Sequence, residues 1–591
     1  MHDIVTHTLR DEISTLKRGF VAAVRERAAE RPDAPAMTFL DHETDWEGRT
    51  IRLTRGELDT RATAMAAQLQ KLARPGDRVA ILCPNGPEYV AAFLACLYAG
   101  LLPVPLLPPE LQRRTERLAP TLEDCSPVVA VTLTAYRASV EAVLAAVGGA
   151  TSDAHVVLAD QVSDEHADAF TPIEPDLSAT AYLQYTSGST RRPGGVEVTH
   201  RNIAVAVAQH VDRQGVDEHS VIVSWLPFFH DMGLVFALIM PLAVGVPAVQ
   251  MTPHAFIQQP LRWLRLFGEY RGTHTMIPNF GLDVCVDAVP VRDRDGVDLS
   301  SVRYVGNASE PVRAQSLARF TEAYAPHGFR HAAHSPCWGL AESTLIVTGI
   351  GVADEPLVEG FDREALAEGR IEPCAVTAPA ARLLVGCGPA FQAQDVRVVD
   401  PGTGLEAAAG EVGELLVRGG SVCHGYWERA GSGETFGRSL DGTSDWMRTG
   451  DLGFFHSGEL FIAGRAKDVI IVDGRNHHAI DIEVTVEQIS PAVRRGHVAA
   501  FPVETGDREL AVVVVELRPE AETTVDLEDL RTAIRAAVAD AHDITLYDVA
   551  LVTRGTIPKT SSGKLRRRIC RTMYTDGELA AQTVAADRTA P

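Results

Sequence analysis

The residues between Tyr185 and Gly195 are suited to binding phosphate. In order, the stretch contains Thr186, Ser187, Gly188, Ser189 and Thr190. Glycine permits backbone conformations that other residues avoid, so several N–H groups can turn toward one anion, while Ser and Thr add hydroxyl donors without bulk. We therefore predict a loop that holds a triphosphate. A solvated Ser/Gly turn has the same composition and is the alternative.

Lys564, close to the other end of the chain, is the second residue suited to chemistry. When a carboxylate attacks the α-phosphorus of ATP, two anions meet while pyrophosphate leaves, so the site needs cations and fixed donors. Lys564 can supply a mobile positive charge, which together with the loop points to an enzyme that activates a carboxylic acid. The alternative is a basic tail, because Arg566, Arg567 and Arg568 adjoin the lysine.

The spacing of these residues argues against a P-loop. A P-loop has a lysine directly after glycine and a hydroxyl residue directly after that lysine. Neither Gly188 nor Gly194 precedes a lysine, and Lys564 precedes Leu565.

The composition limits the class of protein. A chain of 591 residues exceeds one hydrophobic core, so we expect a large domain and at least one smaller one. The net charge of -23 opposes nucleic-acid binding. Nine scattered cysteines without a Cys-x-x-Cys pair favour a reducing cytoplasm. No uninterrupted apolar stretch is long enough to span a bilayer, so we expect no membrane insertion.

Helix and strand patterns alternate in the first part of the chain. Apolar residues recur on one helical face from Leu58 to Leu69, residues 78–82 indicate a buried strand, and residues 88–98 are helical again. This predicts an α/β fold with doubly wound sheets. Such sheets bind ligands beyond the carboxyl ends of their strands, where the hydroxyl-rich loop would lie.

From about Arg382 the pattern changes to short strands and Gly-rich turns, which predicts a β-subdomain, and after Gly464 to a mixed α+β lid. Strands are expected at residues 396–399, 414–417, 460–462, 498–503, 510–517 and 549–553, and a helix at residues 527–541. Residues 576–591 are expected to form a weakly ordered tail.

Six motifs in order along the chain resemble those of the adenylate-forming enzymes. They are the hydroxyl-rich loop and residues 224–234, 338–342, 448–453, 464–468 and 558–564. The resemblance covers nearly the whole chain. It implies a large N-terminal domain, residues 1–464, which binds ATP and the acid, and a small mobile C-terminal lid, residues 465–591.

Within that superfamily the chain most resembles the fatty acyl-AMP ligases. This resemblance is carried by residues 226–234, 278–283, 307–312 and 339–345. An extra segment near residues 350–385 is similar to the insertion of these ligases, which is thought to restrain the lid and to disfavour reaction with coenzyme A. An ordinary surface insertion is the alternative.

The resemblance implies a two-step reaction. A fatty acid and ATP, with Mg²⁺, give an acyl-adenylate and pyrophosphate, and the acyl group then passes to the phosphopantetheine thiol of an acyl carrier protein. The chain has no recognisable carrier module, so the carrier is expected in trans. It can dock on the basic run at residues 566–568 together with Arg571, which can equally be a solvated face. A fatty acyl-CoA ligase and a catalytically inactive nucleotide-binding scaffold are the alternatives.

The resemblance also assigns catalytic roles. Lys564 would touch the carboxylate and the α-phosphate, and Glu342 would hold Mg²⁺. Asp451 would accept both ribose hydroxyls, with a turn aspartate as the alternative, and Arg465 would reach the ribose or the phosphates. Lys467 and Asp468 would lie at the hinge of the lid.

The nucleotide segment of the motif set includes Ala308 and Ser309, which are expected beside the adenine. Trp338 stands where relatives usually have a tyrosine that packs against adenine; an indole can stack in the same way. Gly339 and Leu340 complete the segment. Many relatives also have a phosphate-loop lysine where this chain has Gly194, so Arg191 or Arg192 is expected to replace its charge, or both are solvated.

His230 is expected near the reacting carboxylate, with a packed, hydrogen-bonded histidine as the alternative. Since His230 and Asp231 are too few ligands for zinc, we predict no zinc site there. Phe228, Met232 and Phe280 are expected to line the acyl pocket together with His230, or to be plain core.

Overall fold

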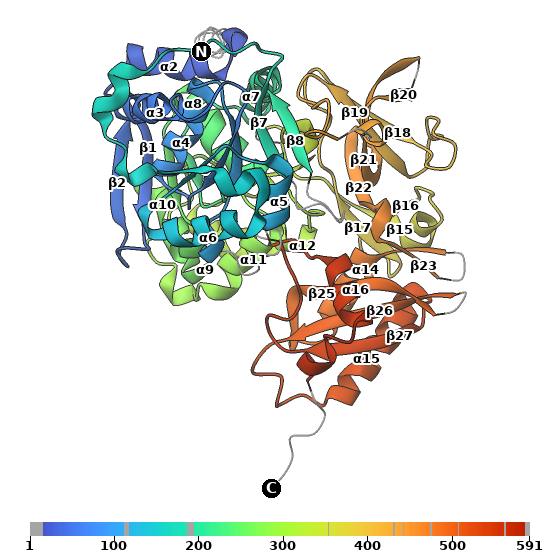
Figure 1. Cartoon of the computed structure of the whole chain (residues 1–591). Helices are drawn as coiled ribbons and strands as arrows, with labels where there is room; N and C mark the ends of the chain where they lie inside the picture. The colour runs from blue at the N-terminus through green and yellow to red at the C-terminus, as the bar shows by residue number, and fades with distance from the viewer. Residues whose placement is uncertain are drawn as a thin grey trace. The chain divides into compact units, whose positions relative to one another are not determined.

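The computed structural model describes residues 16–111, 118–185, 194–352, 354–429, 432–440, 442–472, 475–505, 508–560 and 563–584 (Figure 1). The chain divides into two compact units. Unit 1 comprises Met1–Pro356, Cys387–Val396 and Val417–Met447, and unit 2 comprises Leu357–Gly386, Arg397–Leu416 and Arg448–Pro591. None of the helices in the described ranges combines the length and the apolar character that a membrane crossing demands.

The largest sheet of unit 1 has eight strands in the order β14-β13-β12-β11-β9-β10-β1-β2. The strands are β1 Pro35–Asp41, β2 Arg49–Thr54, β9 Ile222–Ser224, β10 Ala248–Met251, β11 His274–Met276, β12 Tyr304–Asn307, β13 His334–Gly339 and β14 Ile346–Gly349. Pairing is parallel from β13 to β1, whereas β14 and β2 are antiparallel at the two edges. Strands β9 to β12 are buried at every position, as expected for parallel strands covered on both faces.

A second sheet of unit 1, in the order β4-β3-β5-β6, is wholly parallel, and β7 pairs with β8 in a hairpin. Their bounds are β3 Arg78–Leu82, β4 Leu102–Leu106, β5 Val129–Thr132, β6 His155–Leu158, β7 Thr180–Tyr185 and β8 Gly195–Thr199. Strand β7 leads into the hydroxyl-rich loop and β8 leads out of it. The loop's own residues 186–193 lie outside the described ranges.

The helices of unit 1 connect these strands. They are α2 Phe20–Glu30, α3 Arg55–Leu69, α4 Pro87–Tyr98, α5 Leu118–Cys125, α6 Arg137–Val147, α7 His200–Gln214, α8 Met240–Val244, α9 Pro253–Gln258, α10 Pro260–Tyr270, α11 Asn279–Ala288 and α12 Ala314–Tyr324. Thr199 and Asn202 form a reciprocal capping box that starts α7 directly after β8. The exit of the loop is thereby fixed to a helix start.

The C-terminal part of unit 2 is a three-stranded sheet covered by helices on both faces (Figure 1). Its elements are α14 Ala479–Ile489, β25 Val493–Thr505, β26 Arg508–Leu517, α15 Leu527–His542, β27 Leu546–Val552 and α16 Arg567–Thr575. Alternate residues of β26 separate the two cores: Val513 packs with α14 and α15, and Val512 packs with α16. This is the period-two pattern of a sheet buried on both faces.

The remaining elements of unit 2 in the described ranges are mostly short strands, with the short α-helix α13 and two 3-10 helices. The extra segment forms β15 Val358–Asp362, α13 Arg363–Ala367, β16 Pro373–Cys374 and β17 Ala381–Val385. Strand β22 Glu459–Arg465 pairs with the later residues of β21 Thr443–His456, and β23 Val469–Val472 pairs with β24 Arg475–His478. Strands β18 Gln394–Val399, β19 Gly413–Gly419 and β21 contribute residues to both units, and β20 Arg438–Leu440 belongs to unit 1.

The predicted α/β fold class is confirmed, and so are the predicted strand at residues 78–82 and the helix at residues 527–541. The prediction of a weakly ordered tail is wrong for residues 576–584. Leu579 and Val584 are buried in the two cores of the C-terminal sheet, and Val584 N–H donates to the Leu551 carbonyl at 2.9 Å. The two faces of the sheet bury these apolar side chains. Composition alone does not reveal this burial and therefore underestimates the order of the segment.

Candidate active site

Four adjacent parallel strands of unit 1, β9, β11, β12 and β13, end at one edge of the large sheet. The segments that follow them contain nine of the twenty residues predicted for the site. They are residues 225–232 after β9, 277–280 after β11, 308–309 after β12 and 339–342 at the end of β13. The carboxyl edge of a parallel sheet is where α/β proteins bind ligands, so the topology gathers motifs that are distant in the sequence.

Glu342 lies in the short helix Ala341–Ser343, directly after β13. The phenol of Tyr426 donates to Glu342 Oε1 at 2.7 Å, and Cys423 N–H donates to the Glu342 carbonyl at 2.8 Å. Burial, and then the Glu342 carboxylate, raise the pKa of Tyr426 well above its ordinary value, so the phenol stays a donor. Two neighbours that no motif predicted therefore hold this glutamate in place.

Tyr426 also connects Glu342 to the hydroxyl-rich loop. A Cβ built on Gly194 would lie 3.2 Å from the Tyr426 ring, and Trp427 N–H donates to the Gly195 carbonyl at 2.8 Å. The predicted metal carboxylate thus stands one side chain away from the described end of the predicted phosphate loop.

The nucleotide segment at the end of β13 is tightly packed. Trp338 is buried, and a Cβ on Gly339 would overlap the carbonyl oxygen of Leu345. Thr344 has a positive φ of 66°, which non-glycine residues rarely adopt. Its hydroxyl donates to the Ser421 carbonyl at 2.7 Å, so the strained turn is anchored. The side chains of Leu340 and Glu342, which lie beside this turn, are half-buried.

Ser309, after β12, has a second strained backbone, with φ at 80°. Its hydroxyl contacts the sulfur of Met232 at 3.8 Å. Ala308 beside it is buried. A residue predicted beside the adenine therefore touches a residue predicted in the acyl pocket. Backbone strain of this kind clusters where structure is held for a ligand.

His230 precedes the π-helix Met232–Ile239. Its Nδ1 lies 2.6 Å from Asp231 Oδ1, while Met232 N–H donates to the same Asp231 oxygen at 2.7 Å and lies 3.3 Å from His230 Nδ1. The shorter contact favours a proton on Nδ1, because the carboxylate accepts it. That tautomer leaves Nε2 as the ring atom for another partner.

The backbone around His230 is fixed by two buried amides from elsewhere in unit 1. Asn85 donates to the Leu226 carbonyl at 2.8 Å and accepts from Phe228 N–H at 3.0 Å, and Gln184 donates to the Phe229 carbonyl at 2.9 Å. Gln184 lies in β7, just before the hydroxyl-rich loop. The loop stem and the histidine segment are thus directly connected.

Aromatic side chains surround the predicted acyl residues. Phe228 and Met232 are buried, and Phe280 is half-buried. The Phe280 ring packs edge-on against Trp225 at 5.8 Å, and Trp225 stacks on Phe256 at 4.0 Å. An apolar lining of this kind suits a hydrocarbon chain. Sequence reasoning missed the contributions of Trp225 and Phe256, because their stack joins α9 to the residue that follows β9.

In unit 2, Asp451 and Arg465 are cross-strand partners of β21 and β22. Arg465 Nε lies 2.9 Å from Asp451 Oδ1, and Asp451 N–H donates to the Thr449 hydroxyl at 3.1 Å. The Asp451 side chain is 9% exposed, whereas that of Arg465 is 59% exposed. The two predicted ribose residues therefore form one charged pair, with the arginine on the solvent side.

Lys564 lies in a closed turn of unit 2. Thr560 N–H donates to the Lys564 carbonyl at 2.8 Å, and Lys564 N–H donates to the Thr560 hydroxyl at 3.0 Å. Arg566 N–H donates to the Pro558 carbonyl at 3.0 Å. Residues 561–562 of this turn lie outside the described ranges. The turn is defined by its own hydrogen bonds.

The predicted hinge, Lys467 and Asp468, lies in the short helix Ala466–Asp468. Asp468 pairs with Arg567 at 2.8 Å, and Arg567 also pairs with Glu483 at 2.6 Å. Arg567 is therefore an internal residue of unit 2. The hypothesis that the whole basic run serves as a docking surface is wrong for Arg567, because the buried Glu483 and the partly exposed Asp468 engage its guanidinium.

The donor set around Glu342 fits magnesium better than zinc. Within the described residues, no group of three or more His, Cys, Asp or Glu side chains could hold a metal ion. One carboxylate completed by substrate phosphates and water is the usual environment of Mg²⁺. The predicted phosphate donors Thr186 to Thr190, and Arg191 and Arg192, lie outside the described ranges.

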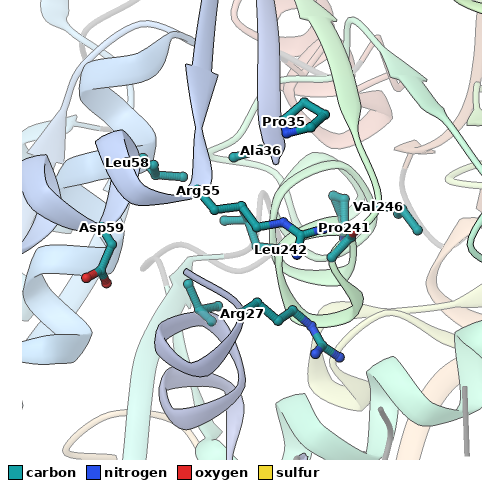
Figure 2. Close-up of a pocket in the computed structure, with 11 residues that line it drawn as sticks. Arg27, Pro35, Ala36, Arg55, Leu58, Asp59, Pro241, Leu242 and Val246 are labelled. Carbon is teal, nitrogen blue, oxygen red and sulfur yellow. Dashed lines mark hydrogen bonds between the residues drawn. The ribbon is translucent and has the colours of Figure 1, made fainter. Parts of the chain in front are cut away.

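A small cavity of unit 1 is lined by residues that are not among those predicted for the site. Figure 2 shows Arg27 and Arg55 beside the end of α8. Arg27 Nε donates to the Ala243 carbonyl at 2.7 Å, and Arg55 Nη2 donates to the Gly245 carbonyl at 2.5 Å. The cavity holds about 20 Å³, which is room for one water molecule. It is a helix-capping feature and too small for a nucleotide or an acyl chain.

Two protein families match this chain, each over a separate range of residues. Residues 24–427 match the family described as AMP-binding enzyme, and residues 467–584 match the family described as Disco-interacting protein 2-like, AMP domain. The chain is 39% identical to the long-chain-fatty-acid–AMP ligase FadD32 of Mycolicibacterium smegmatis, over 96% of each chain. It is 38% identical to the medium-chain-fatty-acid–[acyl-carrier-protein] ligase JamA of Moorena producens, again over 96% of each.

A similar solved structure is the fatty acyl-adenylate ligase from L. pneumophila in complex with acyl adenylate and pyrophosphate. It is 31% identical to this chain, and the match covers 96% of this chain and 97% of that one with a TM-score of 0.74.

Proposed function

We propose that this chain activates a fatty acid with ATP and passes the acyl group to a carrier protein. The chain belongs to the AMP-binding enzymes and, among them, to the fatty acyl-AMP ligases. In the first step a carboxylate oxygen attacks the α-phosphorus of ATP. The bond between the α-phosphorus and the oxygen that bridges to the β-phosphate breaks, and pyrophosphate leaves. In the second step the phosphopantetheine sulfur attacks the acyl carbonyl, AMP leaves, and the thiol proton is lost to solvent.

The contact between Ser309 and Met232 carries this proposal. It joins the strand end proposed to face adenine to the helix start proposed to face the acyl chain, within one edge of one sheet. An acyl-adenylate needs both surfaces side by side. The proposed acyl pocket comprises Phe228, His230, Met232 and Phe280, and the proposed nucleotide surface comprises Ala308, Ser309, Trp338, Gly339 and Leu340.

Lys564 and Glu342 are the residues proposed to balance the negative charge at the reacting phosphorus. Mg²⁺, when bound, neutralises the phosphate oxygens, and Glu342 is the residue proposed to hold it. Lys564 would stabilise the negative charge of the approaching carboxylate and α-phosphate. Asp451 would accept the ribose hydroxyls, with Arg465 beside it. His230 would orient the carboxylate through Nε2.

The lid and its restraint complete the proposal. We place the lid at residues 465–591 after an N-terminal domain of residues 1–464, with the hinge at Lys467 and Asp468. The extra segment near residues 350–385 would restrain the lid. Arg382 of β17 pairs with Asp481 of α14 at 2.7 Å with both side chains largely buried, and Arg363 donates to the Ala541 carbonyl at 3.0 Å. These contacts within unit 2 tie the segment to two lid helices.

The acyl acceptor is proposed to be a holo acyl carrier protein supplied in trans. The similar protein JamA, 96% of whose length is matched by this chain, is named as a ligase of a medium-chain fatty acid to an acyl carrier protein. The cytoplasm is the proposed compartment, where the nine free thiols would remain reduced.

A panel of fatty acids tests the proposal. The acids, from short to long, are incubated with ATP and Mg²⁺, and pyrophosphate release is measured before coenzyme A or a holo carrier protein is added. We expect an adenylate that passes to the carrier and not to coenzyme A. Efficient transfer to coenzyme A would make the protein an acyl-CoA ligase, and no pyrophosphate release with any acid would leave a nucleotide-binding scaffold.

A further inference from the structure

Arg567, three positions after Lys564, holds two acidic side chains at once. Its Nε and Nη2 donate to the two oxygens of Glu483 at 2.6 and 2.7 Å, and its Nη1 donates to Asp468 Oδ2 at 2.8 Å. The Glu483 side chain is fully buried, and Glu483 Oε1 also accepts from Ala500 N–H at 3.0 Å. The pair with Glu483 is the planar two-point geometry that makes arginine pairs strong.

Electrostatics agree with the geometry. Although burial alone would lower the pKa of Arg567, the Glu483 and Asp468 carboxylates raise it above its ordinary value. The guanidinium therefore stays charged while it lies inside the unit. A charged group that is buried and doubly paired is costly to displace, because either carboxylate would lose its partner.

Arg567 also fixes the turn that carries Lys564. It is the first residue of α16, and Arg566 before it is bonded to the Pro558 carbonyl. The turn closed by the Thr560 hydrogen bonds ends directly at this helix. The pairs of Arg567 therefore tie the start of α16, and with it the end of the Lys564 turn, to Glu483 of α14 and to Asp468.

The connection into the lid is anchored at both ends. On one side Arg465 is bound to Asp451 across the β21–β22 pair, and on the other Asp468 is bound to Arg567. Between these anchors lie Ala466 and Lys467, which are both exposed. Rotation of the lid has to be absorbed by backbone dihedral angles, and the anchors leave these two residues as the place for it.

We propose that Arg567 is a positioning residue for Lys564. By binding Asp468 it makes Asp468 part of the rigid lid, moves the proposed hinge from Lys467 and Asp468 to Ala466 and Lys467, and keeps Lys564 at a fixed distance from that hinge. This inference rests on the proposed function, because it assumes that Lys564 acts in adenylation. It predicts a selective defect: adenylation depends on the Arg567–Asp468 contact, whereas transfer from a supplied acyl-adenylate does not.

Asp468→Ala is the informative variant. It removes the hinge contact and leaves the buried pair of Arg567 with Glu483 intact, so the fold is expected to survive. Losing one charge-assisted hydrogen bond should lower kcat for pyrophosphate exchange by ~10-fold, with KM for ATP within about twofold of the parent. Asp468→Asn keeps an oxygen acceptor for Arg567 and should recover part of the loss.

Asp540→Ala is the matched control. It removes the same negative charge from an exposed position of α15 in the same unit, and should leave both steps unchanged. Each variant is measured in three ways: pyrophosphate exchange, acyl transfer from preformed acyl-adenylate to holo carrier protein, and thermal unfolding.

The outcomes separate this inference from the proposed function. A parent enzyme that releases no pyrophosphate with any acid overturns the function itself. An active parent with Asp468→Ala equal to it in adenylation overturns the positioning role. An equal loss in both steps, or a fall in melting temperature that accounts for the loss, would also overturn it, since a merely structural residue behaves in that way.

Discussion

Glu342 and Lys564, the two charged residues proposed at the reaction centre, are held by opposite means. Glu342 is fixed by Tyr426 and Cys423, which are distant in the sequence and reach it through the fold of unit 1. Lys564 is fixed by hydrogen bonds within residues 558–566 and by the pairs of Arg567 in unit 2. One site depends on topology, and the other depends on a local turn.

The difference indicates what each region can do. A glutamate held by the half-buried Tyr426 phenol and by the Cys423 N–H cannot move without disturbing the sheet edge, which suits a group that must hold a metal in one place. A turn that carries its own hydrogen bonds can move as a body with the lid. Substitutions in unit 1 are therefore expected to affect nucleotide and metal binding, and substitutions at the Lys564 turn to affect one chemical step.

The largest effect is expected for Lys564→Ala. Removing one preorganised donor to transition-state charge should slow adenylation by at least ~10²-fold, measured by pyrophosphate exchange. KM for ATP should change little, because the lysine acts in the transition state. Lys559→Ala, on the same turn, is the control and should stay close to the parent. Near-normal exchange in Lys564→Ala would contradict the assigned role.

Glu342→Gln tests the rigid side of the comparison. The amide keeps the shape and the Tyr426 contact but loses the charge that favours Mg²⁺. We expect activity to fall by ~10²-fold at limiting Mg²⁺, the scale of several kcal/mol of metal-assisted stabilisation, and to recover in part at high Mg²⁺. The measurement is a titration with Mg²⁺, after removal of the metal by EDTA. The exposed Glu406→Gln is the control, and an unchanged Mg²⁺ dependence in Glu342→Gln would exclude Glu342 as the ligand.

Tyr426→Phe asks whether Glu342 depends on its distant neighbour. The variant removes one hydrogen bond to a charged oxygen and no ring packing, so we expect a ~10-fold weaker response to Mg²⁺ and little change in stability. Trp427→Phe lies next to it and serves as a packing control. If Tyr426→Phe titrates like the parent, the glutamate is held by the backbone alone.

The two regions also differ in how far sequence could predict them. The string from Pro558 to Lys564 is contiguous, so its motif predicts the turn and the lysine together. The pairing of Tyr426 with Glu342 and the stack of Trp225 on Phe256 join separate segments, and no spacing rule connects them. The prediction of a weakly ordered tail was wrong for the same reason. Leu579 and Val584 are buried against a sheet that composition does not reveal.

Acid stability is expected to show the smallest difference between the two units. Burial lowers the pKa of His210 in unit 1 and of His478 in unit 2 to about 3, against an ordinary value of 6.5. The unfolded chain therefore binds these protons as pH falls through 6.5 while the folded chain does not. Each histidine should cost about 1.4 kcal/mol of unfolding free energy per pH unit below 6.5, and the loss should level off near pH 3.

His210→Leu makes the acid effect measurable. Both ring nitrogens of His210 are buried without a hydrogen-bond partner, so leucine should fit without leaving a polar group unpaired. Urea unfolding at pH 7.5 and pH 5 should show a pH-dependent loss that is smaller in the variant by about one proton's contribution. His219→Leu, at an exposed position, should keep the parent's slope. An identical slope in His210→Leu would mean that His210 is protonated in the folded unit, and the buried histidines could then not explain acid sensitivity in either region.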